Sequence, residues 1–196
     1  MKKMLFVCAM KKEAIDITNK LGMEKISENV YRKENITMLI TGIGKQRTAI
    51  SIMEYLGKNE KPDLIINVGY AGSTDLKIGE WANITKVYNY EWDIPGEEKY
   101  SMIDVGNQAL EIVDASIEKV ECYSSESFVT STNLEGHIAF DMELHSIALI
   151  CDMYKIRLLS LKKISDNLSL EKYYETTGNK EVMELTSCLD YINIEM

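Results

Sequence analysis

The chain has 196 residues, of which 45% are hydrophobic and 27% are charged, and its formal net charge is −9 at pH 7. These values are ordinary for a globular protein, and the length predicts one domain over residues 1–196 with a sizeable core. Only three residues are arginine. Because nucleic acids and anionic membrane surfaces require clustered positive charge, the composition argues against both as partners.

The four cysteines are far apart in the sequence and form no CxxC pair; they are Cys8, Cys122, Cys151 and Cys188. Their spacing predicts buried free thiols in a reducing compartment, not a zinc site or a disulfide framework. The apolar run near the N-terminus stops at Lys11, and no small-residue cleavage site follows. No segment approaches the length of a membrane span. We therefore expect a cytoplasmic protein.

Short apolar runs alternate with segments of helical periodicity along the chain. The predicted strands are residues 4–8, 30–33, 36–41, 64–68, 79–90, 120–124 and 157–164. The predicted helices are residues 11–21, 46–56, 107–117, 142–154 and most of 169–192. This alternation predicts an α/β protein, with a three-layer α/β/α sandwich around a mixed, largely parallel sheet.

In such sheets, ligands bind beyond the carboxyl ends of the strands. Gly42 and Gly44 follow one predicted strand and let the backbone approach a ligand, although a tight turn explains them equally well. Their spacing matches neither a dinucleotide-binding motif nor a P-loop. Glu13 and Asp166 follow two other strands, and each also has a structural explanation as a residue that stabilises a helix start.

A further acid lies in the segment from Phe140 to Ala148. The pattern predicts that Asp141 caps a helix beginning at Met142, which would place Glu143 in the first turn and leave Met142 free to lie against a ligand. A first-turn acid is also favoured by the helix dipole alone. The two histidines belong to no recognisable motif, so we interpret them as structural or surface residues.

Six short blocks occur in one order along the chain. They are Ala9-Met10-x-x-Glu13, Thr41-Gly-Ile-Gly44-Lys45, Ile66-Asn-Val-Gly69-x-Ala71-Gly72, Ser127-Phe128-Val129, Asp141-Met142-Glu143 and Ile164-Ser165-Asp166. Together they resemble the nucleoside phosphorylase/nucleosidase superfamily, and specifically its 5′-methylthioadenosine/S-adenosylhomocysteine nucleosidase branch. The resemblance covers roughly residues 1–167.

This resemblance implies a purine nucleosidase that hydrolyses the N-ribosidic bond to free adenine and the 5-substituted ribose. Asp166 would protonate the purine at N7, held by Ser165, and Glu13 would activate the attacking water, a division of labour comparable with that of glycosidases. The implied substrate contacts come from Met10, Gly44, Phe128, Val129, Met142 and Glu143. The resemblance further implies a homodimer, a small nucleoside as ligand, and neither a metal nor an organic cofactor.

Three functions remain open on the sequence. The first is the nucleosidase just described. The second is a phosphorylase, or a hydrolase of another nucleoside such as futalosine, and the third is a nucleoside-binding homologue that does not cleave. The chain departs from the family pattern at three places, and these departures bear mainly on which substrate is bound. Tyr70 stands where a small residue is usual, and Ser125-Glu126 stand before Ser127-Phe128 where Gly-Asp is usual. The region between Trp92 and Glu126 is shorter than in typical members. Retention of the three acids argues against the third function.

Overall fold

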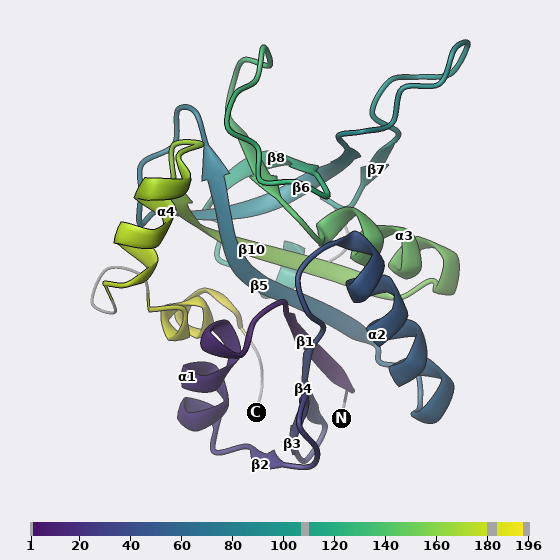
Figure 1. Cartoon of the computed structure of the whole chain (residues 1–196). Helices are drawn as coiled ribbons and strands as arrows, with labels where there is room; N and C mark the ends of the chain where they lie inside the picture. The colour runs from purple at the N-terminus through teal and green to yellow at the C-terminus, as the bar shows by residue number, and fades with distance from the viewer. Residues whose placement is uncertain (1, 107–109, 180–183, 194–196) are drawn as a thin grey trace.

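The computed structural model describes residues 2–106, 110–179 and 184–193 (Figure 1). The strands are β1 (Met4–Cys8), β2 (Glu24–Lys25), β3 (Val30–Lys33), β4 (Ile36–Ile40), β5 (Leu64–Ser73), β6 (Trp81–Asn89), β7 (Met102–Asp104), β8 (Glu118–Ser124), β9 (Ile138–Asp141) and β10 (Arg157–Asp166). The helices are α1 (Lys11–Leu21), α2 (Lys45–Lys58), α3 (Leu144–Tyr154) and α4 (Leu170–Thr177), with the 3-10 helices η1 (Leu110–Ile112) and η2 (Thr186–Tyr191). The predicted α/β class is confirmed.

The strands form one mixed sheet with a parallel centre. β5 lies between β1 and β10 and pairs in parallel with both, and β4 continues the parallel run beyond β1. β6, β8 and β9 are also parallel to one another, and β9 pairs antiparallel with the end of β5. Because β10 also pairs with β6, the strands β5, β10, β6, β8 and β9 form a closed ring. The sheet therefore curls into a small barrel on one side.

Helices cover both faces of the flat part of the sheet, with α1 and α2 on opposite sides of β1 and β4 (Figure 1). Successive side chains of a strand point to opposite faces. Phe6 of β1 accordingly belongs to the apolar cluster that contains Ala14 and Ile17 of α1. Its neighbour Leu5 belongs to the cluster that contains Ile52 of α2 and the buried face of α3. This is the predicted three-layer arrangement.

Several local predictions are confirmed. Helix α1 has the predicted bounds, and it ends where Gly22 adopts a left-handed conformation with φ of 65°. β3 and β4 form the predicted hairpin. The four cysteines are buried and free, as expected. Among the described residues, no helix has the length and apolar character needed to cross a lipid bilayer.

β5 is longer than predicted. The sequence predicts that this strand ends at Val68, with a glycine-containing loop after it, whereas β5 continues to Ser73. Gly69 pairs with Lys162 in β10, so the segment is held in the sheet by backbone hydrogen bonds. Local pattern alone favours a loop here because glycine is a poor strand former.

Helix α3 begins at Leu144 and not at Met142 as predicted. The reason is that Asp141 is the last residue of β9, where it pairs with Ser124 of β8. The side chain of Asp141 nevertheless serves the helix start, since its Oδ2 accepts a hydrogen bond of 2.9 Å from the Leu144 backbone N–H.

Two other helix predictions are wrong in extent. Of the predicted helix 107–117, residues 107–109 lie outside the described residues, and the remainder contains only η1 and an isolated bridge between Val113 and Ile192. The helix predicted over most of 169–192 consists of α4, which ends before Gly178, and the separate η2; residues 180–183 are outside the description. The sequence also fails to predict β2, β7 and β9, which have only 2, 3 and 4 residues.

Candidate active site

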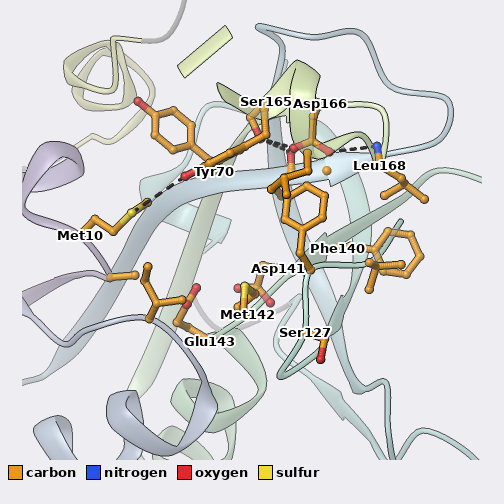
Figure 2. A pocket seen from close by; sticks show the side chains of 18 of the residues that line it. Met10, Tyr70, Ser127, Phe140, Asp141, Met142, Glu143, Ser165, Asp166 and Leu168 are labelled. Carbon is orange, nitrogen blue, oxygen red and sulfur yellow. Dashed lines mark hydrogen bonds between the residues drawn. The ribbon is translucent and has the colours of Figure 1, made fainter. Parts of the chain in front are cut away.

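A cavity of about 260 Å³ lies where the carboxyl ends of the strands converge (Figure 2). It is lined by the ends of β5, β9 and β10, by the segments that follow β1, β4 and β8, and by one face of α4. The lining residues are Ala9, Met10, Glu13, Ile43, Tyr70, Ala71, Gly72, Ser127, Phe128, Val129, Phe140, Asp141, Met142, Glu143, Ser165, Asp166, Leu168, Leu170, Tyr173 and Tyr174. All of the predicted site residues are among them except Gly44.

Gly44 supports the cavity wall without lining it. Its backbone N–H donates a hydrogen bond of 2.9 Å to Oε1 of Glu143. Gly44 has φ of 99°, and a Cβ at this position would lie 3.0 Å from Oε2 of Glu126. The positive φ favours glycine, whereas the flexible side chain of Glu126 could move away from a Cβ. Gly44 thus holds Glu143 in place, and its contact with a substrate stays a prediction.

Glu13 projects into the cavity from the first turn of α1. Its Oε2 accepts a hydrogen bond of 2.7 Å from the Met10 N–H, and its Oε1 accepts one of 3.4 Å from the Tyr70 N–H. Burial raises the pKa of Glu13, although these hydrogen bonds and the ammonium of Lys162 oppose the rise. Gly69 leaves room for the carboxyl group, because a Cβ there would lie 3.2 Å from Oε1. Glu13 thus stabilises its helix and also faces the cavity.

Asp166 enters the cavity at the end of β10. Its Oδ2 lies 2.7 Å from Oγ of Ser165, and its Oδ1 accepts a hydrogen bond of 2.9 Å from the Leu168 N–H (Figure 2). A Cβ on Gly72 would lie only 2.7 Å from Oδ1, so glycine makes room for this acid. Burial raises the pKa of Asp166. Asp166 also precedes the last helix, as its structural explanation requires, but the residue that caps α4 is Ser169.

A buried ion pair lies beneath the cavity. Nζ of Lys162 is 2.8 Å from Oδ2 of Asp141, and the two side chains are 2% and 0% exposed. Burial alone would raise the pKa of Asp141, but Lys162, the Ser124 hydroxyl and the Leu144 N–H together hold it below its usual range. Burial by itself would lower the pKa of the Lys162 ammonium. The nearby carboxyl groups of Asp141 and Glu143 outweigh this effect and raise the pKa.

Glu143 lies near the same Lys162 ammonium, which is already paired with Asp141. One ammonium, that of Lys162, faces the carboxyl groups of Glu13, Asp141 and Glu143. Burial, with the nearby negative charge of Asp141, raises the pKa of Glu143 to about 8. The raised pKa favours the protonated form of Glu143, and a protonated carboxyl can donate a hydrogen bond as well as accept one.

This proton makes the stability of the protein pH-dependent. Between pH 4.5 and about 8, folded Glu143 keeps a proton that the unfolded chain releases, so the free energy of unfolding falls as pH rises through this window. Glu143→Gln keeps the acceptor for the Gly44 N–H and removes the titration. We expect the stability of this variant relative to wild type to be greater at pH 8 than at pH 5, by on the order of 2–4 kcal/mol.

Urea denaturation at the two pH values measures the difference. The exposed acid Glu24 supplies the control, since Glu24→Gln should change the stability equally at both pH values. An equal effect of Glu143→Gln at pH 5 and pH 8 would show that Glu143 is ionised throughout.

An aromatic wall faces the acids. The rings of Phe128 and Tyr173 meet at an angle of 64° with their centroids 5.9 Å apart. Tyr173 also directs its hydroxyl toward Sδ of Met10, at 3.9 Å. Val129 and Met142 complete an apolar surface next to the carboxyl groups. Flat apolar surfaces with a few polar groups suit a planar heterocycle attached to a sugar.

Two residues of this site, Lys162 and Tyr173, were not predicted from the sequence. Lys162 lies in an apolar strand that the sequence predicts to be buried. Because a buried lysine is almost always paired with an acid, its position in this strand could have predicted an ion pair. Tyr173 had no distinguishing signal, because its position depends on how α4 packs over the cavity. His145 is buried and His137 is exposed, and neither lines the cavity, in keeping with the structural or surface role expected for both.

Carboxyl groups, aromatic rings and strand ends converging on one cavity define the class: an α/β protein that binds a small molecule and can carry out acid–base chemistry. The model of the phosphorylase superfamily matches residues 4–126 of the chain. The chain therefore belongs to the phosphorylase superfamily, and the resemblance noted in the sequence is confirmed.

Three similar proteins illustrate the relationship. A 5′-methylthioadenosine/S-adenosylhomocysteine nucleosidase of Exiguobacterium sp. is 26% identical over 89% of this chain and 91% of its own. One of Buchnera aphidicola subsp. Schizaphis graminum is 30% identical over 75% and 73%. A solved structure of a Helicobacter pylori MTAN mutant, with 5′-methylthioadenosine in the active site, has a TM-score of 0.79 at 19% identity and covers 97% of this chain and 96% of its own. At that identity the structural likeness shows the fold alone.

Proposed function

We propose that the protein is a purine nucleosidase that hydrolyses 5′-methylthioadenosine, S-adenosylhomocysteine or a related 5′-modified nucleoside to free adenine and the 5-substituted ribose. The observation that carries the proposal is that Glu13 of α1, Glu143 between β9 and α3, and Asp166 of β10 line one cavity. Curated relatives with this activity align with most of the chain, which supports the same assignment.

The proposed reaction breaks the bond between the purine nitrogen and C1′ of the ribose. Asp166, whose pKa is raised by burial, gives its proton to N7 of the purine, so that the base leaves as a neutral molecule. C1′ acquires oxocarbenium character, and a water molecule attacks it. Glu13 takes a proton from this water, and the products are adenine and the ribose bearing a new hydroxyl group.

The remaining predicted roles concern substrate binding. Glu143, held by the Gly44 N–H, hydrogen-bonds the ribose hydroxyls, and Met142 packs against the sugar. Phe128 stacks on the base, and the backbone of Val129 reads its edge. Ser165 orients Asp166 by the 2.7 Å contact with its Oδ2.

Hydrolysis is favoured over phosphorolysis by the charge of the cavity wall. Among the described residues, no lysine or arginine lines the cavity, whereas four acids do. A phosphate dianion in the cavity would therefore find no lining lysine or arginine to compensate its charge, which is unfavourable in a buried site. Water carries no such penalty.

The direct test is incubation with 5′-methylthioadenosine in phosphate-free buffer, with free adenine measured by chromatography. Adenine release that is independent of added phosphate is the expected result. Release only with phosphate would identify a phosphorylase. If 5′-methylthioadenosine is not cleaved, a nucleoside panel that includes futalosine separates another hydrolase from a non-cleaving binder.

Removal of the stacking ring should weaken substrate binding more than catalysis. We expect Phe128→Ala to raise KM by about ten-fold, since stacking of an aromatic side chain on a base is worth roughly 1–3 kcal/mol. The effect on kcat should be small because the ring does not touch the reacting bond. Tyr154→Ala, which removes an exposed aromatic ring from α3, is the control. An unchanged KM in Phe128→Ala would remove Phe128 from the base site.

We further propose that the chain acts in the cytoplasm as a homodimer. Support for a dimer comes from α2 and α3, which pack against each other and expose large apolar side chains: Ile50 at 68%, Met53 at 39%, Leu149 at 44% and Met153 at 69%. Apolar surface of this kind often marks an interface. Sedimentation velocity of the wild type and of Ile50→Glu measures the assembly.

A further inference from the structure

A lysine is held over two aromatic rings at the rim of the cavity. Nζ of Lys12, an exposed residue in the first turn of α1, lies 5.0 Å from the ring centroid of Tyr173 and 5.9 Å from that of Tyr70. Both rings line the cavity, one from α4 and the other from β5. An ammonium group within about 6 Å of a ring centroid is attracted to the ring face. Two such contacts give Lys12 a defined place beside the cavity.

The charge of Lys12 is available to a ligand. In the part of the chain that the structure describes, its ammonium makes no ion pair with a carboxylate, while the cavity itself is lined by acids. Lys12 is near enough to Glu13 to oppose the rise in the pKa of that acid. A negatively charged group on a ligand would thus find no lysine or arginine among the described residues that line the cavity, and would be attracted at this part of its rim.

The proposed function determines which part of the nucleoside reaches this place. Asp166 meets the purine and Glu143 meets the ribose hydroxyls, so these parts of the cavity are occupied. Met10 lies across the cavity from Leu168 and Asp166 (Figure 2). The hydroxyl of Tyr173 contacts the Met10 sulfur. The group that remains to be accommodated is the 5′ substituent of the ribose, and Met10, Tyr70 and Tyr173 are among the lining residues that remain for it.

We propose that Lys12 is a specificity-determining residue that favours nucleosides whose 5′ substituent ends in a carboxylate. The apolar part of the substituent lies against Met10 and the two tyrosines, and the carboxylate accepts a hydrogen bond from the Lys12 ammonium at the rim. This inference rests on the proposed nucleosidase function and specifies its substrate class. It also gives a role to Tyr70, whose ring helps to hold the ammonium in position.

The test uses two substrates that differ only in charge: an adenosine with a 2-carboxyethylthio group at the 5′ position, and the methyl ester of the same compound. The measured quantity is the ratio of kcat/KM for the acid to kcat/KM for the ester. We expect Lys12→Gln to lower this ratio by about five-fold, the size of a favourable exposed ion pair. The change should lie in KM, because the contact is remote from the bond that breaks.

Two further variants make the result specific. Lys12→Arg keeps a cation that can lie over the rings and should retain the wild-type ratio. Lys11→Gln changes the net charge by the same amount at the neighbouring exposed position and should also retain it. High salt should reduce the preference of the wild type for the acid, since exposed charges are screened.

Three outcomes would overturn the inference. One is an unchanged ratio in Lys12→Gln, and another is an equal fall in Lys11→Gln, which would indicate an effect of net charge alone. The third is stimulation of turnover by phosphate that is lost in Lys12→Gln, which would assign the ammonium to a phosphate site. If the wild type cleaves neither substrate, the proposed function fails by itself, and calorimetric binding of the acid and the ester to wild type and Lys12→Gln still tests the inference.

Discussion

Asp166→Asn is expected to lower kcat for adenine release from 5′-methylthioadenosine by about 10³-fold, within the range that general acid catalysis contributes. The amide cannot give up a proton to N7 of the purine, so the base must leave as an anion. Substrate binding should change little, and KM should therefore stay near the wild-type value. Asp152→Asn, which alters an exposed acid on α3, should leave kcat unchanged.

The fold of Asp166→Asn should be preserved. The carbonyl oxygen of the amide can still accept the hydrogen bond from the Leu168 N–H, and its NH2 group can donate to Oγ of Ser165. A melting temperature close to that of wild type would verify this. Full activity in a folded Asp166→Asn variant would show that another group protonates the purine.

The pH dependence of the wild type provides a second measure of the same role. Because burial raises the pKa of Asp166, the proton is retained to a higher pH than on an exposed aspartate, and kcat should fall only when pH exceeds this raised value. The alkaline fall should be absent from the residual activity of Asp166→Asn.

Lys162→Met is expected to give the largest loss of stability, about 3–5 kcal/mol, because it leaves Asp141 charged and unpaired in the interior. The pair is nearly inaccessible to solvent, so water cannot replace the lost ammonium. Chemical denaturation at pH 7 measures the loss. The control is Lys86→Met, which breaks a more exposed pair with Glu121 and should cost far less.

The double variant Lys162→Met with Asp141→Asn separates the charge effect from lost packing. It should recover much of the stability, since no unpaired charge remains. The neutral amide still offers an acceptor for the Leu144 N–H. If the double variant were as unstable as the sum of the two single variants, the ion pair would not be the source of the loss.

Elements whose structure is determined by residues close together in the sequence were predicted well. Helix α1 combines an apolar face at helical spacing with Gly22 as its terminator, and the hairpin of β3 and β4 has its turn at Glu34-Asn35. The central strands are continuous apolar runs that are buried on both faces. For these segments the residues within a few positions of one another determine the structure, so no distant contact was needed to predict it.

Elements whose structure depends on distant partners were not predicted. Gly69 and Gly72 look like loop residues, yet they lie in β5 because β10 pairs with them and because Glu13 and Asp166 fill the space that side chains would occupy. Helix α3 begins late because β8 and β9 extend the preceding strand to Asp141. The closed ring of strands likewise results from pairings between distant segments.

The sequence by itself determined the α/β class, the identity of the three acids and the aromatic residue at the site, because short motifs preserve residue type and spacing. Only the tertiary structure decided that Lys162 pairs with Asp141, that burial raises the pKa of Glu143, and that Lys12 lies over Tyr70 and Tyr173. Each of these depends on burial and on distances between segments that are far apart in the chain. Charge and dielectric environment, unlike residue identity, are properties of the folded arrangement.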